Sequence, residues 1–163
     1  MGPVPDEDRV EVRLAAPDEL PALYSVREEV FVRGQGVPAE LELDALDSDA
    51  DHAVARTSGA VVGTGRLVDG RIDEAGQLVA GTSGAVGTIG RMAVLGAARG
   101  SGVGRALLDL LVARAGERGL PVVELHAQLH ARRFYERAGF TAFGEVYLEA
   151  GIEHVGMRRR LEG

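Results

Sequence analysis

Cysteine and lysine are absent from this chain of 163 residues, and aromatic residues make up only 4% of it. Without cysteine, the protein has no disulfides, no cysteine-ligated metal and no cysteine nucleophile. With so few aromatic residues, the core must be built mainly from Val, Leu, Ile and Ala. Hydrophobic residues make up 45% and charged residues 26% of the chain, which is a normal balance for a globular domain with its own core.

Basic charge is also scarce, because the formal net charge is −7. This acidity argues against a protein that binds nucleic acid over a broad surface. No stretch approaches the roughly 18 apolar residues that would span a bilayer. Residues 1–9 contain three acidic residues and no apolar run, so we expect no signal peptide there. We therefore expect a soluble cytoplasmic protein without a membrane partner.

The pattern along the chain predicts a disordered N-terminal tail at residues 1–9 and a single domain at residues 10–163. A helix is expected from about Asp18, as its N-cap, to Arg33, another from Gly102 to near residue 119, and a short one over residues 131–138. Residues 69–87 predict a loop or loose hairpin. Strands are expected at residues 10–14, 52–57, 60–68, 88–95, 122–128, 143–148 and 154–161.

The strongest local signal is the glycine-rich segment from Arg99 to Arg105, which lies between an expected strand and an expected helix. Glycines and a helix N-terminus together offer backbone N–H groups to a phosphate, although such a turn can also be only a connection. A nucleoside triphosphate P-loop needs a lysine, which this chain lacks. A dinucleotide fingerprint needs a third glycine where this chain has Arg105 or Leu107.

Arg99, Gly102 and Gly104 match the pattern Arg/Gln-x-x-Gly-x-Gly/Ala. Together with the strand Ile89–Val94 before the segment and the FYE-GF stretch of Ala131–Phe140 after it, the sequence resembles the GNAT family of acyl-CoA N-acyltransferases. Arg27–Val32, Gln35, Ala127-Gln128 and Glu149–His154 are similar to its ElaA/YjcF-like branch. The branch usually has Glu-Gln where this chain has Gly34-Gln35.

The resemblance implies an α/β (α+β) fold. Its sheet would be mixed and mostly antiparallel, with about six or seven strands, helices on both faces and a V-shaped splay between two parallel strands. Acetyl-CoA would be the co-substrate, held in that splay, and no metal is implied. The cofactor-binding residues that the resemblance implies are Met92, Ala93, Val94, Arg99, Gly100, Ser101, Gly102, Val103, Gly104, Arg105, His130, Ala131, Phe134 and Tyr135.

The same resemblance implies that Tyr135 returns a proton to the thiolate of coenzyme A, and that the N–H of Val94 holds the oxyanion. An acceptor amine with a pKa near 10.4 must first lose a proton, so a base or a water chain is needed. Glu124 and His126 alternate on one expected strand and share a face. They are candidate bases, as is His154, and each also has a purely structural interpretation.

Residues 40–51 carry the six carboxylates Glu40, Glu42, Asp44, Asp47, Asp49 and Asp51. A calcium loop is excluded, because its required glycine and glutamate positions hold His52 and Ser58. Two hypotheses stay open: an acidic rim that attracts a cationic amine, and a solvated loop.

The resulting hypothesis is an N-acetyltransferase that transfers an acyl group from acyl-CoA to a small amine or an exposed amino group by direct attack in a ternary complex. The alternative is a non-catalytic acyl-CoA-binding sensor or scaffold on the same fold. A toxin that acylates charged tRNA is disfavoured by the net acidity. The last two strands could pair with a second copy to form a homodimer.

Overall fold

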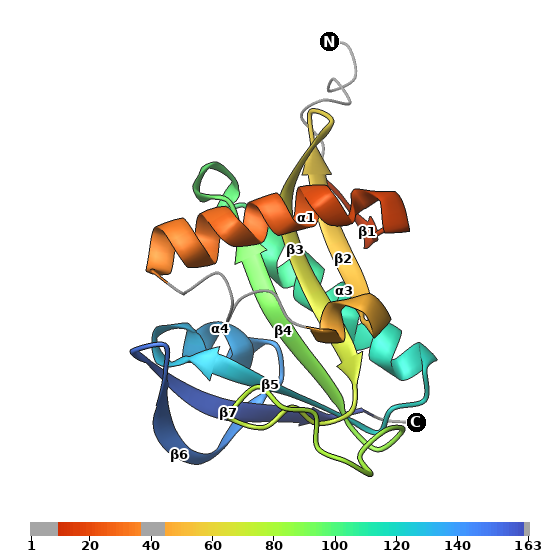
Figure 1. Ribbon diagram of the computed structural model, residues 1–163, viewed down its shortest axis with the longest axis vertical. Coiled ribbons are helices and arrows are strands. Elements are labelled where there is room, and N and C mark those ends of the chain that lie inside the picture. Colours follow the sequence, from red (N-terminus) through yellow and green to blue (C-terminus); the bar gives the residue numbers. More distant parts are fainter. Residues whose placement is uncertain (1–9, 37–44, 162–163) are drawn as a thin grey trace. The chain divides into compact units, whose positions relative to one another are not determined.

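The computed structural model describes residues 10–36 and 45–161 and contains a seven-stranded sheet (Figure 1). The strand order is β1-β2-β3-β4-β5-β7-β6. The strands are β1 (Glu11–Leu14), β2 (Asp51–Thr57), β3 (Ala60–Asp69), β4 (Gly87–Val94), β5 (Val122–Gln128), β6 (Thr141–Glu149) and β7 (Ile152–Arg160). The α-helices are α1 (Leu20–Arg27), α3 (Val103–Glu117) and α4 (Arg132–Arg137). The tail predicted at residues 1–9 lies outside the described residues.

The predicted mixed, mostly antiparallel sheet is confirmed. β4 and β5 pair in parallel, and α3 connects them, as a parallel pair requires a crossover connection. Their register comprises Gly87–Val123, Thr88–Glu124 and Ile89–Leu125. β5 also pairs antiparallel with β7 along its whole length. The V-shaped splay between β4 and β5 stays a prediction, as does pairing of a second copy with the edge strand β6.

The chain divides into two compact units. The first unit comprises the described residues of Met1–Arg66 together with Arg91–Leu111. The second unit comprises those of Leu67–Gly90 and Val112–Gly163. None of the helices within residues 10–36 and 45–161 is long and apolar enough to cross a bilayer.

In the first unit, α1 lies in front of β2 and β3 in Figure 1, and the N-terminal part of α3 lies behind them. α1 continues into the π-helical segment Glu28–Arg33, so the helix predicted up to Arg33 is confirmed. Val26 and Val30 pack against Ala93 in the core. On β3, a Cβ atom at Gly65 would lie 2.4 Å from the sulfur of Met92 and 2.9 Å from Leu111 Cδ1, so any larger residue there would require these two side chains to shift.

A buried ion-pair network around Asp47 connects three segments of the first unit. Arg27 donates to both oxygens of Asp47, over 2.8 and 3.1 Å, and Arg66 donates to Oδ1 over 2.9 Å. All three residues are buried. Burial alone would raise the pKa of Asp47, but the hydrogen bonds and charges of Arg27 and then Arg66 outweigh burial and lower it.

This network corrects the interpretation of the acidic run at one position. Asp47 belongs neither to a solvated loop nor to an open acidic rim, because its carboxylate is enclosed by two guanidinium groups. Glu40, Glu42 and Asp44 lie outside the described residues.

Replacing Asp47 with Asn should lower the free energy of unfolding by about 3 kcal/mol or more, since two buried guanidinium groups would lose their counter-ion. Urea denaturation measures this change. Asp49→Asn, at an exposed neighbouring position, is the control and should change stability by less than about 0.5 kcal/mol. Equal stability of the two variants would contradict a structural role for the Asp47 network.

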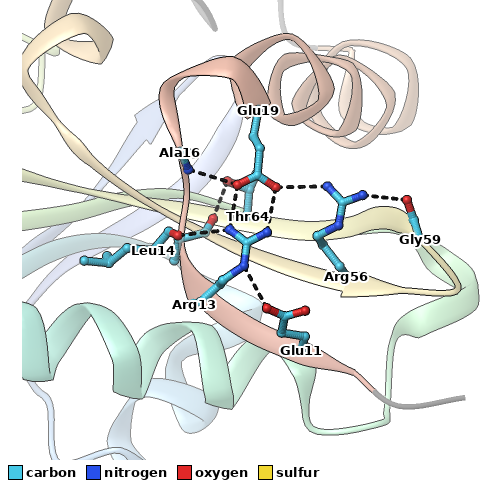
Figure 2. A network of polar contacts seen from close by, with 9 residues as sticks. Glu11, Arg13, Leu14, Ala16, Glu19, Arg56, Gly59 and Thr64 are labelled. Atoms are coloured by element: carbon cyan, nitrogen blue, oxygen red, sulfur yellow. Dashed lines mark hydrogen bonds and ion pairs between the residues drawn. The ribbon is translucent and has the colours of Figure 1, made fainter. Parts of the chain in front are cut away.

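The entry into α1 is held by a second, more exposed network (Figure 2). The carboxylate of Glu19 accepts hydrogen bonds from Arg13 over 2.6 and 3.1 Å, from Arg56 over 2.9 Å and from the N–H of Ala16 over 2.9 Å. The Glu19 side chain therefore caps the N-terminus of the 3-10 helix Pro17–Glu19, which leads into α1. The prediction of Asp18 as N-cap is wrong, because Asp18 lies inside this 3-10 helix. The hydrogen bonds from Arg13, and then from Ala16, lower the pKa of Glu19 from 4.5 to about 2.

A lowered pKa in the folded state means that ionised Glu19 stabilises the fold above its ordinary pKa of 4.5, and that this contribution is lost as the pH falls toward 2. Glu19→Gln should therefore lower the free energy of unfolding by about 1–2 kcal/mol at neutral pH, and the difference from the wild type should shrink on acidification below that ordinary pKa. Urea denaturation at a series of pH values tests this. Glu11→Gln, where the side chain is 63% exposed, is the matched control.

In the second unit, the segment between β3 and β4 is irregular but well anchored. One isolated antiparallel bridge joins Ile72 and Leu78, which agrees with the predicted loop or loose hairpin. The hydroxyl of buried Thr88 donates to the carbonyl of Gly70 over 2.7 Å and accepts from the N–H of Ile72 over 3.2 Å. These bonds fix the first residues of the loop beside β4.

Candidate active site

The glycine-rich segment lies in the first unit, between the end of β4 at Val94 and the start of α3 at Val103. Gly100 and Gly102 have φ values of 81° and 84°, which side chains with a Cβ rarely tolerate. The first N–H groups of an α-helix have no acceptor within the helix, so this turn can present backbone donors to an anion. Arg99 is exposed, and its Nε donates to the carbonyl of Val94 over 3.0 Å.

The preceding strand is distorted at Arg91, which has a φ of 52° inside β4. A non-glycine residue with positive φ in a strand is strained and changes the direction in which the next peptide groups point. Ala93 is buried against α1, whereas the side chains of Met92 and Val94 are half-buried. The strain therefore falls immediately before the three residues whose backbone is expected to meet the cofactor.

Tyr135 lies on α4 in the second unit and is half-buried. Its ring makes edge contacts with Phe134 and Phe140, at centroid distances of 5.0 and 6.2 Å. Burial raises the pKa of its phenol to about 12, so the hydroxyl keeps its proton at neutral pH. None of the described residues forms a hydrogen bond with this hydroxyl. His130 is exposed, and its Nε2 lies 2.7 Å from Oε1 of Gln128.

A pocket of about 590 Å³ opens entirely within the second unit. Two predicted site residues, Glu124 and His126, line it side by side on β5. Tyr135 and His154 do not line it. The full lining consists of Arg71, Ile72, Asp73, Glu74, Ala75, Glu124, His126, Phe143, Gly144, Glu145, Tyr147, Gly156 and Arg158.

Glu124 is held by two arginines inside this pocket. Arg71 donates to both of its carboxylate oxygens over 2.7 and 3.0 Å, and Arg158 donates to Oε2 over 3.0 Å. Burial would raise the pKa of Glu124, but the hydrogen bonds and charges of Arg71, with those of Arg158, lower it. A carboxylate with a lowered pKa is a weak base, so the geometry favours a role in organising the pocket.

His126 makes two hydrogen bonds that define its tautomer. Its Nε2 lies 2.7 Å from the carbonyl oxygen of Ile72, which can only accept, so Nε2 carries the hydrogen. In the neutral ring Nδ1 is then an acceptor, and the hydroxyl of Tyr147 donates to it. The pKa of Tyr147 is raised by burial and then by the charges of Glu149 and Glu74, so this hydroxyl stays protonated.

His154 lies behind Tyr147 and outside the pocket lining. Its ring stacks on the Tyr147 ring with a centroid distance of 5.8 Å and an interplanar angle of 27°. Its Nδ1 donates to the carbonyl of Ile152 over 2.7 Å, and its Nε2 lies 3.5 Å from Glu149 Oε2. This buried position favours a supporting role for His154.

The sequence analysis missed the three side chains that hydrogen-bond to Glu124 or His126 in the pocket: Arg71, Tyr147 and Arg158. Arg158 stands opposite Glu124 in the β5–β7 register, so a cross-strand charge pair was in principle detectable. Arg71 is 53 residues from Glu124, in an irregular loop, and no local pattern indicates that contact. Within residues 10–36 and 45–161, the structure shows no cluster of three or more acidic or histidine side chains arranged to hold a metal ion.

The chain matches the acetyltransferase (GNAT) domain family over residues 8–161. It resembles in structure an acyl-CoA N-acyltransferase from Pseudomonas aeruginosa, with a TM-score of 0.73 and 36% identity over 93% of this chain and 98% of that one. The protein therefore belongs to the GNAT family of acetyltransferases, as its sequence motifs predicted.

The chain is also similar to members of the branch that its motifs indicated. It is 34% identical over 145 residues to the uncharacterized N-acetyltransferase YjcF of Bacillus subtilis, covering 87% of this chain and 93% of YjcF. It is 32% identical over 146 residues to ElaA of Escherichia coli, covering 88% of each chain. The crystal structure of E. coli ElaA has a TM-score of 0.77 to this chain and covers 93% of it and 100% of ElaA, at 28% identity.

Glu124→Gln should lower the free energy of unfolding by about 1–3 kcal/mol, because Arg71 and Arg158 would lose their shared counter-charge. Urea denaturation measures this, with Glu153→Gln at an exposed position of β7 as the control. If Glu124 were instead the base, stability would be retained and only the rate of acyl transfer would fall, which would contradict its organising role.

Proposed function

We propose that this protein transfers an acyl group, with acetyl as the first candidate, from acyl-CoA to a small amine or an exposed amino group. Both substrates are bound together, and the amine attacks the thioester directly. The observation that carries the proposal is the family membership over residues 8–161 combined with the glycine-rich turn before α3.

In this proposal the first unit binds the coenzyme. Backbone N–H groups from Gly100 to Arg105 hold the pyrophosphate, with help from the positive end of α3. Backbone groups of Met92, Ala93 and Val94 bind the pantetheine arm, and the N–H of Val94 stabilises the oxyanion that forms on the thioester carbonyl. The strain at Arg91 supports this role, because it redirects the backbone immediately before those residues.

Tyr135 is the proposed acid. When the amine nitrogen has bonded to the carbonyl carbon, the C–S bond breaks and coenzyme A leaves as a thiolate. Tyr135 donates its phenolic proton to that sulfur and recovers a proton from the reacting nitrogen. Because burial raises the pKa of Tyr135 to about 12, its phenol keeps the proton at neutral pH and can donate it to the leaving sulfur.

The direct test is to incubate the purified protein with acetyl-CoA and a panel of primary amines, and to follow thiol release with a thiol-reactive dye. We expect amine-dependent thiol release for at least one class of amine. Failure with every amine, while calorimetry shows that coenzyme A still binds, would overturn the transferase and support the acyl-CoA-binding sensor.

Tyr135→Phe should lower kcat by about 10²-fold or more, because the leaving thiolate loses its proton donor. The dissociation constant for coenzyme A should stay within about twofold, since the ring and its contacts remain. Steady-state kinetics and calorimetry measure the two effects. Tyr24→Phe removes the same hydroxyl from α1 and is the control. A kcat unchanged by Tyr135→Phe would remove Tyr135 from the mechanism.

A further inference from the structure

The pocket of the second unit contains a hydrogen-bonded pair, Tyr147 and His126, whose donor and acceptor directions are defined by the surrounding backbone. We propose that this pair is a proton relay that accepts the proton of an alkylammonium acceptor bound in the pocket. The proposal rests on the acyl transfer proposed above and identifies the acceptor site and the base of that reaction.

The direction of the relay follows from the tautomer. The carbonyl of Ile72 holds the hydrogen on Nε2 of His126, which leaves the Nδ1 lone pair directed at the Tyr147 hydroxyl. The Tyr147 oxygen donates its one hydrogen to Nδ1 and keeps its own lone pairs, and none of the described residues donates a hydrogen bond to it. An ammonium group in the pocket can therefore donate to the Tyr147 oxygen.

The proton transfer balances without any further reactant. The ammonium gives one proton to the Tyr147 oxygen while the original hydroxyl proton moves to Nδ1 of His126. The products are a neutral amine, a neutral tyrosine and an imidazolium whose two N–H groups donate to Tyr147 and to the Ile72 carbonyl. The amine lone pair then forms the C–N bond, and His126 later returns its proton to solvent.

The charge and size of the pocket agree with a small cationic acceptor. The lining contains more carboxylates than guanidinium groups. The four carboxylates are those of Asp73, Glu74, Glu124 and Glu145, and the two guanidinium groups are those of Arg71 and Arg158. This excess of negative charge favours a cation. A volume of about 590 Å³ lies within the range of roughly 300–1,000 Å³ that is typical of small-molecule sites.

The other candidate bases are less suited to this step. Glu124 is occupied by Arg71 and Arg158, which lower its pKa. His154 faces Ile152 and Glu149 and does not line the pocket. The charged or titratable groups that face the relay are Arg71, Glu124 and Arg158 beside it, Asp73, Glu74 and Glu145 in the pocket lining, and His154 with Glu149 behind Tyr147.

The test compares two acceptors in the wild type, Tyr147→Phe and His126→Gln. One acceptor is the best alkylamine of the panel, which is protonated at neutral pH, and the other is hydroxylamine, which is already neutral there. If the relay removes the ammonium proton, each variant should lose about 10²-fold in kcat/KM with the alkylamine. With hydroxylamine the loss should be below about fivefold, because no proton has to be removed before attack.

Tyr135→Phe is the matched control, because it affects departure of the thiolate and should slow both acceptors alike. Binding of coenzyme A, measured by calorimetry, checks that each variant is folded, and either variant alone suffices if the other does not fold.

The outcomes separate the two proposals. An active wild type with equal losses for both acceptors would overturn the relay and leave the transferase standing. A wild type that releases no thiol with any amine would overturn the proposed function and the relay together.

Discussion

The carboxylate of Glu124 is the contact on which the pocket depends. Glu124 lies in the middle of β5. It binds Arg71 of the loop before β4 and Arg158 of β7. Ile72, the residue after Arg71, accepts the hydrogen bond that orients His126. The buried carboxylate of Glu124 therefore holds in place the loop residue Ile72, which defines the tautomer of His126. Glu124 can stay charged there because the two arginines outweigh the cost of burying it.

In the first unit, a strained residue and two glycines shape the backbone of the proposed coenzyme site. Arg91 departs from strand geometry shortly after the three residues of β4 that pair with β5. Gly100 and Gly102 turn the chain into α3. These features cost conformational energy, and the apolar packing of Val26, Val30 and Ala93 and the Asp47 ion pairs offset it nearby. In the proposed mechanism, binding of the coenzyme relies on backbone groups, whereas the proton transfers rely on side chains.

Elements with a strong period were predictable from the sequence, and contacts between distant segments were not. Alternation and helical spacing identify the strands and helices, and the glycine pattern locates the turn before α3. The role of Asp47 depends on ion pairs with Arg27 and Arg66, which are 20 and 19 residues away. No local sequence pattern indicates these contacts. Tyr147 was missed because Gly144, with a φ of 73°, lies in an irregularity between Phe143 and Tyr147 that disturbs the simple alternation of β6.

The different roles proposed for Glu124 and His126 follow from the need to remove a proton from the amine acceptor. A lysine-like amine has a pKa near 10.4, so at neutral pH almost all of it carries the proton that prevents attack. A carboxylate paired with two arginines is stabilised in its charged form and has little tendency to take that proton. In the proposed relay, Nδ1 of His126 takes the proton through the Tyr147 hydroxyl that donates to it, and the raised pKa of Tyr147 keeps that hydroxyl protonated between transfers. In this proposal, the same strand places a carboxylate paired with two arginines beside the histidine that accepts the proton.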